Sequence, residues 1–402
     1  MSENPLHTLM SPKSIAIVGA SNNPMKMGTM QALSVIKDGY QGKLYPIHPT
    51  EQTVVGLKAY ALPEELPETP DLGLIVVPMA HVFPLLESFG RIGTKRIIVC
   101  TAGFKEVGND GKHLEQKLNE TAARWGIRFV GPNCMGIINS AISLNLTVMK
   151  FDGRPGLLGL ASQSGTYVTQ TLPYLRKRGI RLSKAISTGN EANIDLIEAM
   201  EYLGEDEQSR AIILYIESIR DGHRFIEAAR KISPHKPIFA QYVGGSAAGA
   251  RAGMSHTGAM AGPDFLYEGI FKQAGIIRVH SIEDLYAHGW TAATQPPLQG
   301  NRIAVVTHSG GPGTAMSHVA DQGGLELPTL SAGVQNEIRQ YIPSHAASAN
   351  PVDLTFNMDT DRMTVIIPEI LLKSGEIDGL LIHGPMLSGW MKEAHPHLAM
   401  LF

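Results

Sequence analysis

The chain has 402 residues, a length that suits two or three domains better than one. It is 43% hydrophobic and 18% charged with a net charge of −3, which is the composition of a globular protein. The near-neutral charge argues against nucleic-acid binding, which requires a clustered excess of basic residues. No apolar run approaches the roughly 20 residues of a membrane-spanning helix, and the first residues lack the pattern of a secretory signal.

The chain contains two cysteines, Cys100 and Cys134, which do not form a C-x-x-C motif. We therefore predict neither a disulfide framework nor a zinc site, and no other metal site in this chain. Sparse cysteine usage fits a reducing compartment. We expect a cytoplasmic protein that contacts neither nucleic acid nor membrane.

Short apolar runs alternate with amphipathic stretches as far as residue 145 or so. This alternation predicts an α/β domain with a parallel sheet flanked by helices. A helical pattern that ends at Lys37 follows the first predicted strand. A Gly/Pro-rich stretch at 151–156 predicts a linker, so we place the first domain at 1–150. Its predicted strands are 14–18, 44–47, 72–77, 96–100 and 128–130.

Two further α/β series follow. The second domain, 151–296, has predicted strands at 157–161, 183–187, 211–217, 237–242 and 275–279, and a second boundary lies at 295–300. The third domain, 297–402, has predicted strands at 302–307 and 378–383. A parallel domain usually has about four to six strands. We therefore expect the third domain to be incomplete, and the chain to be either a natural half-protein or a piece of a longer one.

Domains two and three open with a similar pattern. Residues 157–166 and 303–311 both read as a strand, then Ser or Thr, one residue, Ser-Gly and a helix. Two interpretations remain open at this stage: a duplicated turn that holds an anion, or turn chemistry that two α/β domains share.

The loop after the first strand, 19–28, lies where doubly wound folds present backbone N–H groups to phosphate. It lacks the G-x-G-x-x-G spacing, and His48 follows the second strand where an NAD site requires Asp or Glu. Lys26 suits a phosphorylated ligand other than NAD. The alternative is a plain strand–helix turn with a surface lysine.

The segment 244–262 consists almost entirely of small residues around His256. Phosphate or backbone can approach such an imidazole closely. A histidine nucleophile must be neutral and held by a carboxylate on its other ring nitrogen. Glu217, at the end of the predicted strand 211–216, is a suitable partner. The alternatives are a structural histidine and a solvent-facing acid.

Motifs along the whole chain, in order, resemble those of the NDP-forming acyl-CoA synthetases, which include ADP-forming acetate–CoA ligases and the succinyl-CoA synthetase alpha subunit. The resemblance is carried by segments 14–21, 101–106, 131–136, 162–165, 188–190, 215–218, 255–262, 273–279 and 350–353. It implies a Rossmann-like CoA-binding domain followed by flavodoxin-like domains with parallel sheets.

The resemblance also implies site residues. His256 matches the phosphorylated histidine of the family, and Glu217 matches the acid that hydrogen-bonds it. The residues that match phosphate-binding positions are Ser162, Gln163, Ser164, Gly165, Thr257 and Gly258. The residues that match CoA-binding positions are Gly19, Ser21, Asn22, Lys26, Pro78, Thr101, Ala102, Gly103 and Asn133.

The implied reaction is acid + CoA + ATP giving acyl-CoA + ADP + phosphate through a phosphohistidine. ATP/ADP and Mg would bind an ATP-grasp domain or subunit, and nothing in these residues resembles one, so we expect such a partner and an oligomer. Thr169 stands near the place of a tyrosine in succinyl-CoA synthetases, which disfavours succinate. The alternatives are a non-catalytic CoA-binding module, as in some protein acetyltransferases, and an NAD-dependent dehydrogenase.

Overall fold

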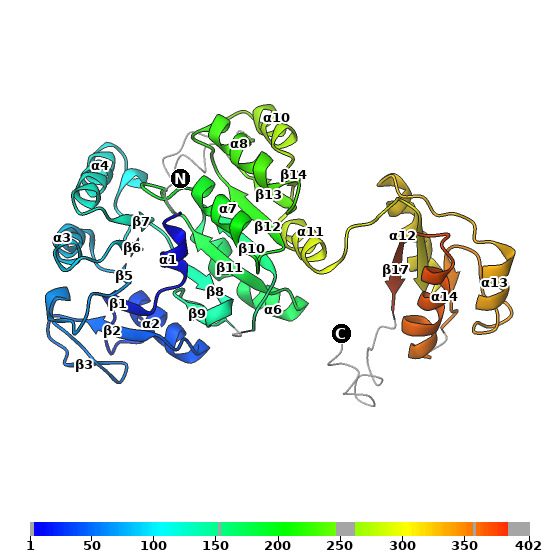
Figure 1. Cartoon of the computed structure of the whole chain (residues 1–402), viewed down its shortest axis with the longest axis horizontal. Coiled ribbons are helices and arrows are strands. Elements are labelled where there is room, and N and C mark those ends of the chain that lie inside the picture. The colour runs from blue at the N-terminus through cyan, green and yellow to red at the C-terminus, as the bar shows by residue number, and fades with distance from the viewer. Residues whose placement is uncertain (1–3, 152–153, 247–261, 357–358, 385–402) are drawn as a thin grey trace. The chain divides into compact units, whose positions relative to one another are not determined.

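The computed structural model describes residues 4–151, 154–246, 262–356 and 359–384 (Figure 1). The chain divides into two compact units, Met1–Gln295 and Pro296–Phe402. The first unit contains two sheets of mainly parallel strands, and the described part of the second unit contains one parallel sheet. The α/β architecture that the alternating pattern predicts is confirmed.

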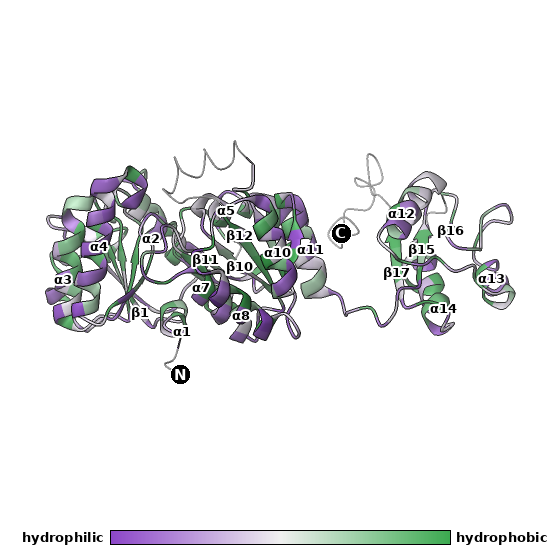
Figure 2. Cartoon of the chain, turned by 90° about the horizontal axis from the view of Figure 1, so that it is seen from above, coloured by the Kyte–Doolittle hydropathy of each residue, from purple (hydrophilic) through white to green (hydrophobic). Residues whose placement is uncertain are grey.

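The first sheet of the first unit contains five parallel strands in the order β2-β1-β5-β6-β7. Helices α3 and α4 cover one face and α2 covers the other (Figure 2). All five predicted strands are confirmed to within two residues at each end. The strands are β1 (Ser14–Val18), β2 (Lys43–Ile47), β5 (Leu72–Ile75), β6 (Arg96–Val99) and β7 (Arg128–Val130); the helices are α1 (Leu6–Met10), α2 (Met27–Asp38), α3 (Val82–Ile92) and α4 (Asn109–Arg124); and a small hairpin pairs β3 (Thr53–Val54) with β4 (Leu57–Lys58).

The second sheet contains seven strands in the order β14-β13-β12-β10-β11-β8-β9. Its five parallel strands are the predicted ones, shifted by at most two residues: β10 (Leu158–Ser162), β11 (Leu182–Ser187), β12 (Ala211–Ile216), β13 (Ile238–Tyr242) and β14 (Ile277–Val279). Two short antiparallel strands, β8 (Ile137–Asn139) and β9 (Leu144–Asn145), extend its edge. They precede the predicted linker at 151–156 but belong to this second sheet.

The helices of the second sheet lie on both of its faces. One face packs against α7 (Leu196–Glu205), α8 (Gly222–Ile232) and α10 (Asp264–Ala274). The other packs against α6 (Leu172–Arg178) and α11 (Ile282–Thr294), with the short α5 (Gly165–Thr169) before α6. Helix α7 begins with a capping box in which Asp195 and Glu198 each accept a hydrogen bond from the other's backbone N–H.

One hydrophobic core joins the two sheets of the first unit. Ile15 and Leu74 of the first sheet and Ile212 of the second belong to the same buried cluster, together with Ala32 of α2 and Met200 of α7. The buried strands read as nearly continuous apolar runs because both of their faces are covered (Figure 2). Burial of this shared core explains why the two sheets form one compact unit.

The second unit carries a three-stranded parallel sheet in the order β16-β15-β17. Its core includes Val306, Val352 and Leu371, all buried. Both predicted strands are confirmed to within one residue at each end. The strands are β15 (Ile303–Thr307), β16 (Val352–Asp353) and β17 (Gly379–His383), and the helices are α12 (Gly310–Gln322), α13 (Ala332–Ile338) and α14 (Ile367–Lys373), the last preceded by a π-helical turn, Arg362–Ile366.

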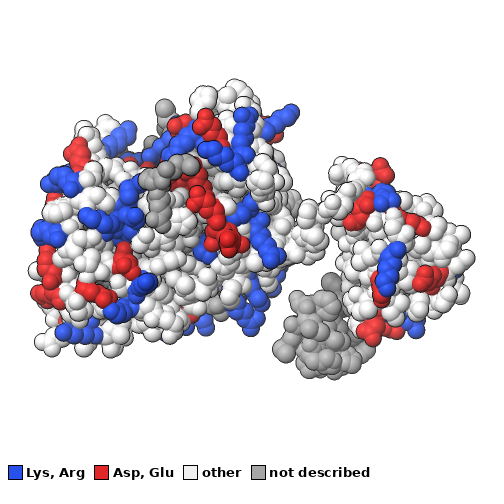
Figure 3. Space-filling view, viewed as in Figure 1, with Lys and Arg blue, Asp and Glu red and all other residues white. Residues whose placement is uncertain are grey.

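Basic and acidic side chains are interspersed over the face of the described residues seen in Figure 3. Within the described parts of the chain, no helix combines the length and apolarity needed to cross a bilayer.

Candidate functional site

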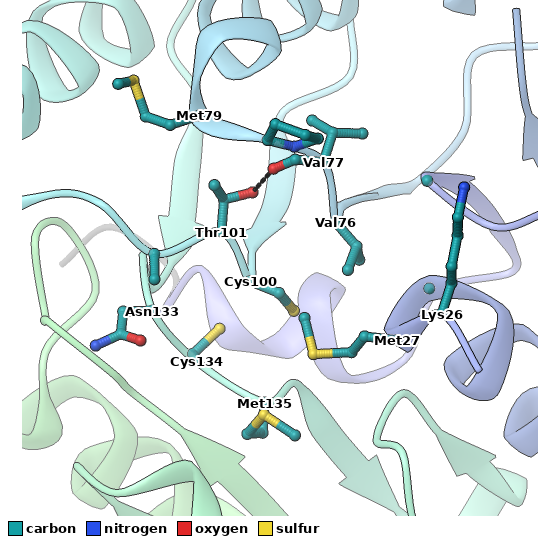
Figure 4. Close-up of a pocket in the computed structure, with 14 residues that line it drawn as sticks. Lys26, Met27, Val76, Val77, Met79, Cys100, Thr101, Asn133, Cys134 and Met135 are labelled. Atoms are coloured by element: carbon teal, nitrogen blue, oxygen red, sulfur yellow. Dashed lines mark hydrogen bonds between the residues drawn. The ribbon is translucent and has the colours of Figure 1, made fainter.

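A pocket of about 550 Å³ opens at the carboxyl ends of β1, β5, β6 and β7 (Figure 4). Open parallel sheets bind their ligands at this edge, where the loops after the strands converge. The lining residues come from four such loops: Gly19, Lys26, Met27, Gly28, Val76, Val77, Pro78, Met79, Cys100, Thr101, Ala102, Asn133, Cys134 and Met135.

Gly19 allows the first loop to pass close to its neighbour. Its φ is +104°, and a Cβ added there would lie 2.0 Å from the carbonyl oxygen of Val76. No other residue tolerates both that dihedral and that contact. The close approach brings the start of α2, with Lys26 as its N-cap residue, to the pocket wall.

Six of the nine predicted CoA-binding residues line this pocket: Gly19, Lys26, Pro78, Thr101, Ala102 and Asn133. The pocket joins loops that are far apart in the sequence. Asn133 N–H donates to the carbonyl oxygen of Thr101 at 3.0 Å, and Thr101 Oγ1 donates to the carbonyl oxygen of Val77 at 2.7 Å. These bonds fix the three loops against one another.

The other three predicted residues, Ser21, Asn22 and Gly103, do not line this pocket. Ser21 is buried, and its backbone N–H donates to Thr29 Oγ1 at 3.0 Å. Asn22 Nδ2 donates to Glu51 Oε2 at 2.5 Å and to the carbonyl oxygen of Thr53 at 2.8 Å. Asn23 N–H donates to Ser21 Oγ at 3.2 Å, so the side chains of Ser21 and Asn22 both shape the first loop.

Sequence analysis did not select the sulfur-containing and aliphatic residues of the pocket wall. They are Met27, Val76, Val77, Met79, Cys100, Cys134 and Met135, together with Gly28. Their signal was position: Val76, Val77 and Cys100 lie at the ends of predicted strands and the others in the loops that follow, where the carboxyl edge of the sheet lies. Their chemistry gave no signal, because apolar residues after a strand are usually read as packing.

The second part of the candidate site is the turn between β10 and α5. Ser162 Oγ donates to the carbonyl oxygen of Ser164 at 2.7 Å and accepts from Ser164 N–H at 3.2 Å. Gln163 Oε1 accepts from the backbone N–H groups of Glu217 at 2.6 Å and Ser218 at 3.0 Å. The predicted phosphate-binding residue Ser162 therefore closes the turn and engages Ser164 N–H, Gln163 holds the turn to the loop after β12, and the backbone N–H of Gly165 remains a candidate for an anion.

Glu217 directly follows β12 and is buried, with 7% of its surface exposed. The two hydrogen bonds to Gln163 Oε1 fix the Glu217 backbone at the carboxyl edge of the second sheet, next to the turn at Ser162–Ser164. The other predicted residues of this part, His256, Thr257 and Gly258, lie outside the described residues.

The pocket and the turn are neighbours. A Cβ added to Gly165 would lie 2.2 Å from Cγ of Met135, which lines the pocket. Met135 N–H donates to Ser187 Oγ at 3.0 Å, which ties the pocket wall to β11. The first helical residue after the turn thus packs directly on the wall of the pocket.

The turn at Ser162–Ser164 has a counterpart in the second unit. Thr307 Oγ1 donates to the carbonyl oxygen of Ser309 at 2.7 Å and accepts from its N–H at 3.2 Å, as Ser162 does with Ser164. The repeat seen in the sequence is therefore a repeat of turn structure.

Three family models match successive parts of the chain. The CoA binding domain matches 13–140, the succinyl-CoA ligase like flavodoxin domain matches 155–290, and the ligase-CoA domain matches 303–384. The alpha subunit of acetate–CoA ligase (ADP-forming) II from Pyrococcus furiosus is 40% identical over 349 residues, which are 87% of this chain and 76% of that protein. The chain belongs to the NDP-forming acyl-CoA synthetases.

Other relatives support the same assignment. The 4-hydroxybutyrate–CoA ligase (ADP-forming) of Nitrosopumilus maritimus is 33% identical over 92% of this chain, which spans 53% of that protein. The solved structure of the dinucleotide-forming acetyl-coenzyme A synthetase 1 of Candidatus Korarchaeum cryptofilum, in complex with phosphate and ADP, has a TM-score of 0.87 with 33% identity, and covers 94% of this chain and 81% of that one. The chain corresponds to the alpha-type region of these synthetases, and the predicted fold class is confirmed.

In this acyl-CoA synthetase chain, Glu106 connects the pocket to the second sheet. Glu106 Oε1 accepts from Gly103 N–H at 2.6 Å, and Oε2 accepts from Asn190 Nδ2 at 2.6 Å. Asn190 also lies 3.3 Å from Asn133 of the pocket wall. Burial raises the pKa of Glu106, but the hydrogen bonds from Asn190 and the 103–104 backbone more than offset it and leave the pKa below its ordinary value. The carboxylate is therefore ionised at neutral pH.

We expect Glu106→Gln to weaken CoA binding by roughly tenfold, since one charge-assisted hydrogen bond to the 101–103 loop or to Asn190 is lost. Isothermal titration calorimetry with CoA measures the change. Glu120→Gln, an exposed position on α4, is the matched control and should leave the affinity unchanged. Equal affinities of the Glu106→Gln variant and the native chain would remove Glu106 from the support of the pocket.

Proposed function

We propose that this chain is the CoA-binding and phosphohistidine-carrying part of an ADP-forming acid–CoA ligase. One observation carries the proposal: the pocket at the carboxyl edge of the first sheet packs, through Met135, on Gly165 of the turn that also holds Glu217. A CoA thiol in the pocket and a phosphoryl group near the turn would thus lie next to each other. The relatives named for acetate and 4-hydroxybutyrate support a monocarboxylic acid as substrate.

The proposed reaction has three steps. His256 accepts the γ-phosphoryl group of ATP, and ADP leaves. The phosphoryl group then passes to the carboxylate of the acid, which gives an acyl phosphate and restores the neutral imidazole. The CoA thiolate attacks the acyl carbon, forms the thioester and releases phosphate. Glu217 would hold the imidazole in the tautomer that exposes its attacking nitrogen, and the backbone N–H of Gly165 would face the phosphoryl oxygens.

The chain does not account for nucleotide binding. Sequence motifs for an ATP-grasp region are lacking in these residues, and the relative from Pyrococcus furiosus is named as an alpha subunit. We therefore propose a beta-type ATP-grasp partner that holds ATP/ADP and Mg, an oligomeric complex, and a cytoplasmic location where ATP and CoA are available.

Two measurements test the function. Calorimetric titration of the purified chain should show CoA binding and no comparable binding of NAD. Addition of a beta-type ATP-grasp subunit should then give ADP formation that requires CoA and a carboxylic acid together. Binding of NAD in place of CoA would contradict the proposal, and CoA binding without ADP formation over a panel of acids would favour the non-catalytic module.

A further inference from the structure

Cys100 and Cys134 meet in the wall of the CoA pocket, although they are distant in the sequence. Cys100 follows β6 and Cys134 lies in the loop after β7, and these strands are neighbours in the sheet. Both residues line the pocket and both are buried, at 4% and 2% exposure. Figure 4 shows their sulfur atoms close to one another, with Met27 and Met135 beside them. The spacing in the sequence gave no sign of this pair.

The two thiols have unequal surroundings. Cys100 Sγ accepts a hydrogen bond from Gln31 Nε2 at 3.5 Å, and it is also the hydrogen-bond neighbour of the Cys134 thiol. Cys134 Sγ faces the carbonyl oxygen of Val99 at 3.4 Å, an acceptor that disfavours a thiolate. Hydrogen bonds from Cys134 and Gln31 lower the pKa of Cys100 despite its burial, whereas the bond to Cys100 and burial raise the pKa of Cys134. Cys100 is therefore the thiol of the pair that ionises first.

We propose that Cys100 and Cys134 form a thiol–disulfide exchange site for organic disulfides that carry a CoA arm. The inference rests on the proposed CoA binding, because the pocket delivers the ligand sulfur to the two thiols. Pairs of adjacent thiols in which one ionises first are the arrangement that exchanges disulfides. The family reaction does not require it, since acyl transfer to the CoA thiol involves no oxidation.

The exchange balances with CoA disulfide as the oxidant. The Cys100 thiolate attacks one sulfur of the bound CoA disulfide, a new S–S bond forms between Cys100 and that CoA, and the other CoA leaves as a thiolate. Cys134 then loses its proton to solvent and attacks Cys100 Sγ, which releases the second CoA thiolate. The products are a Cys100–Cys134 disulfide and two molecules of CoA thiol, each protonated from solvent.

Burial selects the ligand. Both sulfur atoms are nearly covered from bulk solvent and face a pocket of about 550 Å³. A small disulfide that does not occupy the pocket reaches them only by diffusion into its interior. A disulfide that binds by its CoA arm places its sulfur there at high effective concentration.

The full-length chain, reduced and freed of reductant, is incubated with CoA disulfide or, in parallel, with glutathione disulfide. Released CoA thiol and the intact mass of the protein are followed together, and non-reduced peptide mapping locates the cross-link. The native chain should release two CoA thiols and become lighter by two hydrogens. Cys134→Ser should release one CoA thiol and retain one CoA as an adduct on Cys100. Cys100→Ser should react at least roughly tenfold more slowly, because the remaining thiol ionises poorly.

Several results would overturn the proposal. They are equal rates for Cys100→Ser and the native chain, a rate with glutathione disulfide equal to that with CoA disulfide, and CoA binding without any exchange. Peptide mapping of the native chain decides the question even where a variant fails to fold. A calorimetric titration with CoA on the same sample separates the two hypotheses: a chain that binds CoA but does not exchange refutes only the exchange site, and a chain that does not bind CoA refutes the proposed function.

Discussion

Replacing His256 with alanine is expected to abolish the transfer of labelled phosphate from ATP to this chain in the presence of a beta-type ATP-grasp subunit. The imidazole is the proposed attachment point, and alanine offers no nucleophile in its place. Overall ligase activity should fall to the background, while CoA affinity stays at the native value because the pocket proposed for CoA lies on the first sheet. The measurement is the amount of acid-labile labelled phosphate on the gel-purified chain, compared between the variant and the native chain.

Glu217→Gln tests the orienting role in the same assay. The amide keeps the size of the side chain and loses the charge that would stabilise the imidazole tautomer, so phosphorylation should slow by about a hundredfold. CoA affinity should not change. Glu120→Gln on the exposed face of α4 is the control for loss of a negative charge. Persistent labelling of the His256→Ala variant would refute the phosphohistidine, and an unchanged rate in Glu217→Gln would remove Glu217 from the site.

The strands were predictable because of how parallel sheets are buried. Both faces are covered in β1, β10 and β12. The sequence of each strand is therefore a continuous apolar run, which can be recognised without knowledge of the tertiary structure. β8 and β9 escaped prediction because, unlike the equally short β7, they do not follow a predicted helix in the alternating pattern. The pairing of β8 with β11, and of β9 with β8, depends on the tertiary structure, which brings them to the edge of the second sheet.

The parts of the candidate site that lie in loops after strands could be predicted from the sequence. Lys26, Thr101 and Asn133 follow strands of one sheet, and parallel strands bring their loops to one edge. Contacts between loops were not predictable. Gln163 holds the Glu217 backbone instead of presenting its amide to solvent, and Cys100 meets Cys134 across two strands. Both depend on side-chain packing between residues that are distant in the sequence.

Gly165→Ala is expected to weaken CoA binding by roughly tenfold or more. The new methyl group would lie 2.2 Å from Cγ and 2.9 Å from Cβ of Met135, so the Met135 side chain must move. Its backbone N–H is held by Ser187, and its side chain already lines the pocket, so the displaced atoms have the pocket to move into. Overpacking of this kind costs about 1–3 kcal/mol. Calorimetric titration with CoA measures the loss.

Shortening the obstructed side chain should reduce the effect. In a Met135→Ala background the 2.2 Å contact with Cγ is gone and the 2.9 Å contact with Cβ remains, so Gly165→Ala should then cost clearly less CoA affinity, relative to Met135→Ala alone, than it costs in the native chain. Gly222→Ala is the matched control: Gly222 also begins a helix, α8, and a Cβ there finds its nearest neighbour at 3.7 Å, an ordinary contact. An effect of Gly165→Ala that is undiminished in the double variant would place its cause in the turn itself. A reduced effect in the Met135→Ala background would mean that the first residue of α5 reaches the proposed CoA pocket through one side chain, which is the link that the proposed transfer of the acyl group from acyl phosphate to the CoA thiol requires.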